Sequence, residues 1–478
     1  MKNNRIFRMA VTTAITWSTL CASAQTITLG DLFFAVRDGD METVRQYIAS
    51  GSPIDPKNEN GVTPLIMAAY YGKMDIADLL LASGAAYDAA YRTSSGITYL
   101  MVFSRIGDLR RVKALLDMGA DIHGKDVNGD SALHWAIRAG QKATASFLIQ
   151  KGADIHMKGL LGITPLIDAA CKGDMETAGL IVPRLSREEI RYETPMGETA
   201  IHFAVGSGNR ELIMLLINRG ADINQRTRDG SIPMFRAVYY HQTDQPEFFK
   251  FLLDHGADPN IPTQGGYTVF QYLLETSYLA DRNTYEKTMD LLIGSKKVNL
   301  NWRDESGVSL LYHAFGRDDW TFLKMIDAGV DVNADNDSGM PLLLLALLKR
   351  RTDLARVLLD HGAKYDARFH YKRTSENDMN HDGFNYAMGF AYAGMAKELE
   401  LCLDRGAEVN GRDEYGFTPL LWAAMGQEDP DTIRLLIKRG ADVDAKNRWG
   451  WTALYLVNRF EGNQPLAKIL LDAGAKPE

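Results

Sequence analysis

Two segments of the chain combine residue types that could do chemistry at their spacing. In the first, residues 129–134 read Gly-Asp-Ser-Ala-Leu-His, so the hydroxyl of Ser131 precedes the imidazole of His134 by three residues. A serine nucleophile with a histidine base would suit ester hydrolysis, but it also needs an oriented base and an oxyanion site. The chain carries no G-x-S-x-G, H-E-x-x-H or Walker motif. We therefore predict that the protein is not an enzyme.

The second segment is residues 378–383, where Asp378, Asn380 and Asp382 alternate as in the first half of a calcium loop. In such a loop the alternating oxygens surround the ion and a bidentate glutamate completes the coordination. The position that requires this glutamate is Gly389. We therefore expect a solvated insertion rather than a calcium site.

The same insertion contains His370 and His381, whose imidazoles are possible metal ligands. Lone exposed histidines usually do not bind a metal, so we assign neither a metal nor a cofactor. The alternative function is an envelope enzyme or metal-binding protein that uses the insertion 368–382. Tight stoichiometric calcium or zinc binding that is lost on changing Asp378 and Asp382 would favour that alternative.

Composition places the chain among folded soluble proteins. Its 478 residues are 46% hydrophobic and 24% charged, which argues against wholesale disorder and against a polytopic membrane protein. The formal net charge is −8 and the isoelectric point is about 5.8. Because nothing favours a phosphate backbone as the main partner, we predict no nucleic-acid binding.

The first 24 residues have the layout of a secretory signal peptide. Three basic residues precede an uncharged stretch at 9–20, and residues 22–24 read Ala-Ser-Ala. Cleavage after Ala24 would start the mature chain at Gln25, with 50 Lys and Arg against 61 Asp and Glu and a net charge of −11. We therefore expect export to the periplasm. A buried or membrane-anchoring helix and a lipoprotein modified at Cys21 are the alternatives.

Glycines that open a similar pattern of residues recur at intervals of 32 to 44 residues. They are Gly61, Gly96, Gly129, Gly162, Gly197, Gly230, Gly266, Gly307, Gly339, Gly383, Gly416 and Gly450. The sequences that start at 61 (GVTPLIMAA), 162 (GITPLIDAA) and 416 (GFTPLLWAA) are nearly identical. Each stretch then continues to a Leu-rich segment and Gly-Ala-Asp or a variant. One supersecondary unit therefore repeats along the chain.

Each part of the pattern has a physical reason. The opening glycine suits a turn that needs a positive φ, the threonine hydroxyl caps the first helix, and the proline occupies the first helical position. The paired alanines let neighbouring helices approach closely, and the second helix supplies an apolar stripe such as residues 79–81. A glycine then ends the second helix in the left-handed conformation. Each repeat is therefore predicted to be a helix pair plus a connecting hairpin.

These residues and their recurrence resemble the ankyrin-repeat family over residues 27–478. The resemblance implies an all-α dominated solenoid of helix-turn-helix plus β-hairpin units, about thirteen with the caps. We divide the chain into a signal peptide (1–24), an N-terminal capping repeat (25–60), ankyrin repeats (61–449) and a C-terminal capping repeat (450–478).

Two further features fit a soluble solenoid. Cys171 and Cys402 lie six repeats apart, too far for a disulfide, and the chain has no C-x-x-C pair. We expect both to be unpaired structural thiols. The leucine run at 342–348 is too short to span a membrane and predicts a buried helix.

Some repeats depart from the pattern. The fifth loses its Gly-Ala-Asp after residues 181–183, and the seventh to eleventh lack Thr-Pro-Leu. The two longest glycine spacings contain insertions at 278–285, which we place between two helices, and at 368–382, where a hairpin is expected. These insertions are either tolerated loops or functional additions.

The resemblance implies that residues flanking each turn glycine, and those about nine and ten after it, line a concave face. Aromatic side chains dominate protein-binding hot spots. The predicted protein-binding residues are Tyr70, Tyr71, Leu160, Leu161, Tyr239, Tyr240, Tyr267, Phe384, Tyr415, Phe417, Trp449 and Trp451. Ile97, Ile163, Tyr392 and Phe460 occupy equivalent places. Alternatively, the aromatic rings stack between hairpins and only stabilise the solenoid.

The function that follows from the resemblance is a non-catalytic protein-binding scaffold in the periplasm. We expect a monomer that binds an unidentified protein partner through the concave groove and has no membrane span after signal cleavage. An immunity or inhibitor protein that captures a toxic or lytic enzyme would fit export, an acidic groove and the absence of catalytic motifs. The fold alone does not name the partner.

Overall fold

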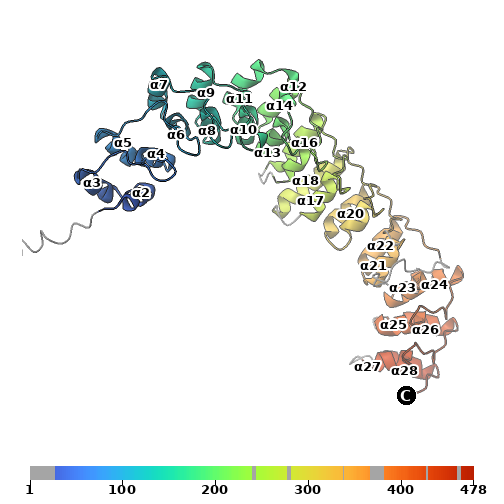
Figure 1. The fold of residues 1–478 in the computed structure, drawn as a ribbon. Coiled ribbons are helices and arrows are strands. Elements are labelled where there is room, and N and C mark those ends of the chain that lie inside the picture. The colour runs from blue at the N-terminus through green and yellow to red at the C-terminus, as the bar shows by residue number, and fades with distance from the viewer. Residues whose placement is uncertain are drawn as a thin grey trace, which may run out of the picture. The chain divides into compact units, whose positions relative to one another are not determined.

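The computed structural model describes residues 27–239, 244–276, 281–336, 339–366, 382–426, 429–459 and 464–477. These residues form thirteen helix pairs, the number of repeats expected from the glycine pattern. The pairs divide into two compact units, an N-terminal unit that ends at Arg228 and a C-terminal unit that begins at Asp229. Within each unit the pairs can be followed one after another in Figure 1.

The N-terminal unit contains six pairs. They are α2 (Leu29–Asp38) with α3 (Met41–Ala49), α4 (Pro64–Tyr70) with α5 (Met74–Ala82), α6 (Tyr99–Ile106) with α7 (Leu109–Asp117), α8 (Ala132–Arg138) with α9 (Lys142–Gln150), α10 (Pro165–Lys172) with α11 (Met175–Ile181), and α13 (Ala200–Ser207) with α14 (Arg210–Asn218). Short 3-10 helices at Leu160–Gly162 (η1) and Val182–Arg184 (η2) and the helix α12 (Arg187–Ile190) complete this unit. The last two stand where the fifth repeat loses its Gly-Ala-Asp.

The C-terminal unit contains seven pairs. They are α15 (Met234–Val238) with α16 (Gln245–Asp254), α17 (Val269–Glu275) with α18 (Arg282–Gly294), α19 (Leu310–Ala314) with α20 (Asp319–Asp327), α21 (Leu342–Leu348) with α22 (Thr352–Asp360), α23 (Tyr386–Tyr392) with α24 (Ala396–Asp404), α25 (Pro419–Gly426) with α26 (Pro430–Lys438), and α27 (Ala453–Arg459) with α28 (Gln464–Asp472). The leucine run at 342–348 forms the buried helix α21, as predicted.

Helices of neighbouring repeats pack on each other within each unit. The first helices form one row, in which α4 packs on α2 and α6, and α25 packs on α23 and α27. The second helices form another row, as α26 does with α24 and α28. The buried leucines, such as Leu65 and Leu436, lie between these rows, and burying each contributes about 2 kcal/mol. The core is therefore a chain of contacts between neighbours.

The capping and turn predictions are confirmed. The hydroxyl of Thr63 accepts a hydrogen bond from the backbone N–H of Ile66 at 3.2 Å, and Pro64 is the first helical residue. Thr164 and Pro165 do the same in the fifth repeat. All twelve turn glycines have φ between 69° and 84°, a region that only glycine adopts without cost.

The hairpin turns are held by backbone hydrogen bonds and by the carboxylates of aspartates together. The carboxylate of Asp126 accepts the backbone N–H groups of Asn128 and Asp130, and Asp304 accepts those of Ser306 and Val308. In the described residues the hairpins contain only isolated antiparallel bridges, at Arg92–Thr98, Arg303–Ser309 and Asp335–Pro341. The β-hairpins expected from the family resemblance are thus tight turns without an extended ladder.

One insertion differs from its prediction. Residues 282–285 belong to the first turn of α18, where the Asp281 carboxylate accepts the backbone N–H of Thr284, so they do not connect two helices as we had placed them. Residues 277–280 and 367–381 lie outside the described residues, as does the expected signal peptide at 1–24. Among the described residues, no helix has the length and apolar character to cross a membrane.

Candidate functional site

Ser131 and His134 form a helix cap. The Nδ1 atom of His134 lies 3.2 Å from the backbone nitrogen and 3.0 Å from the hydroxyl of Ser131, while its Nε2 lies 3.2 Å from the carbonyl oxygen of Ile163. Because a carbonyl only accepts, Nε2 carries the proton and Nδ1 is the acceptor. Both residues are buried, and burial lowers the pKa of the imidazole. Thr199 and His202 repeat this arrangement, so the Ser-His pair belongs to the repeat.

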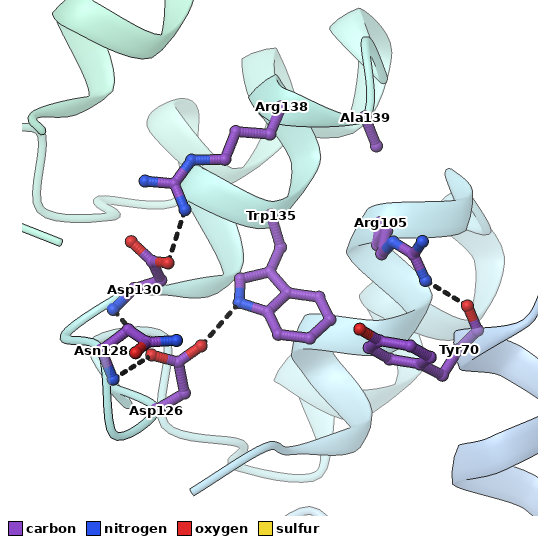
Figure 2. A pocket seen from close by; sticks show the side chains of 8 residues that line it. All are labelled: Tyr70, Arg105, Asp126, Asn128, Asp130, Trp135, Arg138 and Ala139. Carbon is purple, nitrogen blue, oxygen red and sulfur yellow. Dashed lines mark hydrogen bonds and ion pairs between the residues drawn. The ribbon is translucent and has the colours of Figure 1, made fainter. Parts of the chain in front are cut away.

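A pocket of about 350 Å³ opens in the N-terminal unit at the repeat positions predicted to bind proteins. Trp135 forms its centre, because the indole Nε1 donates to Asp126 at 3.1 Å while the ring meets Tyr70 edge-on with centroids 5.9 Å apart. Figure 2 shows the indole between the acidic hairpin and Tyr70. Arg105 lies over the Tyr70 ring at 4.5 Å and donates to the Tyr70 carbonyl oxygen.

Arg138 and Asp130 belong to the polar lining of this pocket. Arg138 donates to the carboxylates of Asp130 and Asp168, and its Nε lies 2.8 Å from an Asp168 oxygen. Burial raises the pKa of Asp168 to about 6, although the arginine favours the ionised form. Asp130 also accepts the backbone N–H of Leu160 at 3.1 Å. Arg138 is therefore shared by two buried acids, Asp130 of the pocket lining and Asp168 of the next repeat.

A stacked series of rings lies in the last two repeats of the C-terminal unit. Tyr415 stacks on Trp449 with centroids 5.6 Å apart, Trp449 on Trp451 at 5.2 Å, and Trp451 on Tyr455 at 5.7 Å. We call these four residues the aromatic row. The hairpin turn fixes the backbone of the two tryptophans, because the Asn447 side chain accepts hydrogen bonds from the backbone N–H groups of Trp449 and Trp451, both at 3.0 Å.

The aromatic row is open to solvent and carries cations. Trp449 is 48% exposed, while the other three rings are half-buried. The guanidinium of Arg448 lies 4.0 Å from the Tyr415 centroid and 4.4 Å from that of Trp449, and Arg459 lies 5.5 Å from the Trp451 ring. The predicted neighbourhood of Tyr415, Trp449 and Trp451 is confirmed.

Two of the predicted binding residues are buried. Phe417 is 4% exposed and packs against Trp422 at 5.3 Å, and Phe384 is fully buried with its ring edge-on to Trp422 at 5.1 Å. The prediction that these two rings line a binding surface is therefore wrong. Phe417 supports the aromatic row from the buried side, because its ring lies edge-on to Trp449 with centroids 6.2 Å apart.

The remaining predicted residues lie in other repeats. Tyr71 is exposed and meets Tyr70 edge-on at 5.3 Å. Leu160 and Leu161 are exposed in η1, and Leu161 has a φ of 57°, which is uncommon for a non-glycine residue. Exposed Tyr239 pairs with Tyr272. Tyr267 is exposed, and Tyr240 lies outside the described residues, as does Phe460. Ile97, Ile163 and Tyr392 are half-buried.

Sequence reasoning missed several residues of both sites. Trp135 and its acceptor Asp126 are separated by nine residues, and the same Asp-to-Trp spacing at 413 and 422 could have revealed them. Of the cations over the row, Arg448 directly precedes Trp449 and could have been noticed as its neighbour, and Arg459 follows Tyr455 by four residues, one turn of α27. The pocket residues Arg105 and Arg138 come from consecutive repeats at the same position, nine residues after their turn glycines.

Most of the residues in the metal prediction lie in the insertion 368–382. Asp378, Asn380, His370 and His381 lie outside the described residues, and within the described part no group of three or more His, Cys, Asp and Glu side chains could hold an ion. Gly389, where a calcium loop needs its glutamate, lies in α23, and a Cβ there would come within 3.0 Å of Leu347.

Both predicted thiols are free. Cys171 is exposed and Cys402 is buried. Burial raises the pKa of the Cys402 thiol to about 12, so it stays protonated.

Comparisons with known proteins agree with this architecture. A family model described as ankyrin repeats (3 copies) matches residues 32–102, 85–159, 166–263 and 374–478, more than half of the chain. Ankyrin repeats are generally protein-binding scaffolds and are typically not catalytic.

Individual relatives match shorter stretches. A putative ankyrin repeat-containing protein of Treponema pallidum is 36% identical over 106 residues, covering 22% of this chain and 35% of that protein. The phosphocholine transferase AnkX of Legionella pneumophila is 24% identical over 236 residues, covering 47% of this chain and 24% of that protein. The human BCL-6 corepressor-like protein 1 is 32% identical over 84 residues, covering 18% of this chain and 4% of that protein. The chain thus spans between 4% and 35% of the length of these relatives.

Proposed function

The chain belongs to the ankyrin-repeat family, and from this premise we propose that it is a non-catalytic scaffold that binds a protein partner through the aromatic row. The observation that carries the proposal is the stacked series Tyr415–Trp449–Trp451–Tyr455 with Trp449 half exposed. A large ring that loses this exposure on binding removes apolar area from water at little entropic cost.

The rigidity of the aromatic row supports its role as an anchor. Each ring is held by a stacking neighbour, and the Asn447 side chain fixes the backbone between the two tryptophans. A partner that contacts these rings therefore does not have to order them first, which lowers the cost of association. The pocket around Trp135 is a second place with aromatic and charged groups at equivalent repeat positions.

For the biological role we propose export to the periplasm and capture of a toxic or lytic enzyme, as an immunity or inhibitor protein. The basic and apolar pattern of residues 1–24 supports export. The acidic net charge supports a protein rather than a nucleic acid as the captured molecule. A gene for a secreted effector next to the gene for this chain would add support to neutralisation.

The proposal is tested by crosslinking and pull-down from a periplasmic extract, followed by affinity measurement with the captured protein. Trp449→Ala and Trp451→Ala should each weaken binding by about 2 kcal/mol, or roughly thirtyfold. Trp320→Ala is the matched control, because Trp320 is half-buried on the second helix α20 of the same unit.

Two outcomes would contradict the proposal. If both tryptophan variants keep their circular dichroism spectra and bind like the wild type, the partner uses another surface. If both unfold, the rings are structural.

A further inference from the structure

The segment that carries three of the four rings of the aromatic row differs in charge from the chain as a whole. Residues 445–459 contain three basic residues, Lys446, Arg448 and Arg459, and no Asp or Glu, whereas the whole chain has a net charge of −8. Arg448 and Arg459 are exposed. A partner that approaches Trp449, Trp451 and Tyr455 therefore meets the positive charge of this segment, while Asp413 and Glu414 precede the fourth ring, Tyr415.

The two guanidinium groups are held by rings and by no carboxylate of the described residues. Arg448 lies over Tyr415 and Trp449, and Arg459 lies over Trp451 and donates to the Tyr455 hydroxyl at 3.2 Å. By contrast, Arg351 and Arg439 in the same unit each pair with two carboxylates. A guanidinium that lies over aromatic rings rather than against a carboxylate keeps N–H donors for a carboxylate of the partner.

The rings themselves favour an anion. Because stacking occupies ring faces, a partner meets mainly ring edges, which carry positive partial charge. The indole N–H groups of Trp449 and Trp451 have no acceptor among the described residues, whereas those of Trp135 and Trp422 donate to aspartates. Guanidinium edges, indole N–H groups and ring edges thus all present positive charge or donors.

We infer that the aromatic row binds an acidic segment of the protein partner, in which carboxylates accept hydrogen bonds from Arg448 and Arg459 and an apolar side chain packs against the exposed edge of Trp449. The inference rests on the proposed function and adds the chemistry of the partner. A sugar that stacks on aromatic faces fits less well, because Trp449 already stacks on two neighbouring rings.

The test selects peptides on the immobilised full-length chain from a phage library of random dodecapeptides. The peptides whose capture depends on Trp449 should be enriched in Asp and Glu, and their affinity should fall as salt is added. The Arg448→Glu, Arg459→Glu double variant should weaken binding tenfold or more by fluorescence anisotropy, an effect of order 1.4 kcal/mol.

The controls separate charge from folding. Arg434→Glu on α26 should bind like the wild type, because Arg434 pairs with Asp431 and lies away from the rings in sequence. Arg448→Lys keeps the charge but loses the planar guanidinium with its several N–H donors, and should bind less tightly than the wild type and more tightly than the double variant. If the double variant fails to fold, two other measurements test the inference. Peptide affinity of the wild type should still fall as salt is added, and Arg448→Lys should still bind less tightly than the wild type.

Each contrary outcome has a different meaning. Selected peptides that need Trp449 but are neutral or basic would overturn this inference and leave the proposed function intact. A single-stranded oligonucleotide could also bind more tightly than the acidic peptides, with the same dependence on Arg448. The row would then be a site for polyanions in general, and this result would overturn the inference as well. If the selection yields no peptide whose capture depends on Trp449, that result would count against both proposals.

Discussion

Asp413 accepts a hydrogen bond from the indole Nε1 of Trp422, nine residues later, at 3.1 Å. The same carboxylate accepts the backbone N–H groups of Tyr415 at 3.0 Å and Phe417 at 2.8 Å. Asp126 and Trp135 repeat this relationship at the same spacing and distance. One buried carboxylate thus closes the hairpin turn, fixes the first helix against it, and sets the backbone from which the Tyr415 ring reaches Trp449.

Replacing Asp413 with alanine should therefore destabilise the last repeats by about 2–3 kcal/mol, because three donors lose their acceptor in a buried place. Trp422→Phe is the matched variant. It removes only the indole donor and should cost less, about 1–2 kcal/mol. Urea unfolding followed by circular dichroism measures both. Equal losses in the two variants would show that the backbone hydrogen bonds of Asp413 contribute little.

The repeat architecture could be predicted because its signals are local. A glycine at a positive φ, a threonine cap and a proline at the first helical position each act over a few residues, and Gly61, Thr63 and Pro64 show all three. Repetition adds the long-range information, since the same local unit must stack on its neighbours to bury the apolar faces. The number of repeats and the positions of the first helices therefore follow from the sequence.

The candidate site was harder to predict, because spacing places a residue on a hairpin without deciding which way its ring points. Tyr267 and Phe417 both follow a turn glycine, yet Tyr267 is exposed and Phe417 is buried. The ring of Phe417 packs against Trp422 of its own repeat and Trp449 of the next repeat. Such packing depends on the three-dimensional arrangement of the side chains, so a single sequence spacing could not separate the two cases.

Alanine substitutions at two helical glycines should change the free energy of unfolding in opposite directions. A Cβ at Gly426, the last residue of α25, would lie 2.3 Å from the carbonyl oxygen of Tyr392, which is backbone and cannot rotate away. Gly426→Ala should destabilise the protein by about 2 kcal/mol or more through this overlap. Gly179 in α11 has nothing within 4 Å of such a Cβ, and Gly179→Ala should stabilise it by about 0.5–1 kcal/mol.

Thermal unfolding of the two glycine variants beside the wild type measures this contrast. A stabilised Gly426→Ala variant would mean that α23 and α25 can move apart without cost, contrary to their close packing.

Export is tested by the mass of the purified protein. We expect the periplasmic form to begin at Gln25, because the Ala-Ser-Ala of residues 22–24 matches a signal-peptidase site. Intact-mass spectrometry of the periplasmic and cytoplasmic fractions distinguishes the processed chain from the full one. Recovery of the Met1 form from the cytoplasm, with no processed species, would contradict export and with it the capture of an envelope toxin.

The buried acid Asp168 makes stability depend on pH. Burial raises its pKa from the ordinary value of 3.8 to about 6 in the folded protein, even though Arg138 lies against it. The folded chain therefore binds this proton more tightly than the unfolded chain does between those two values. The free energy of unfolding should then decrease as the pH rises from about 4 to about 6, and above about pH 6 the loss is complete.

For a shift of about two pKa units this loss is up to about 3 kcal/mol. Asp168→Asn has no proton to bind, so the difference in unfolding free energy between the wild type and this variant should change across pH 4 to 6 and stay flat above it. Urea unfolding at a series of pH values measures the difference, in which the other titrating groups cancel. Asp254→Asn is the control, because a hydrogen bond from Lys250 lowers the pKa of Asp254 below this window. A flat difference for Asp168→Asn would show that Arg138 keeps the carboxylate ionised, and that the two buried acids paired with Arg138 share one cation without taking up a proton.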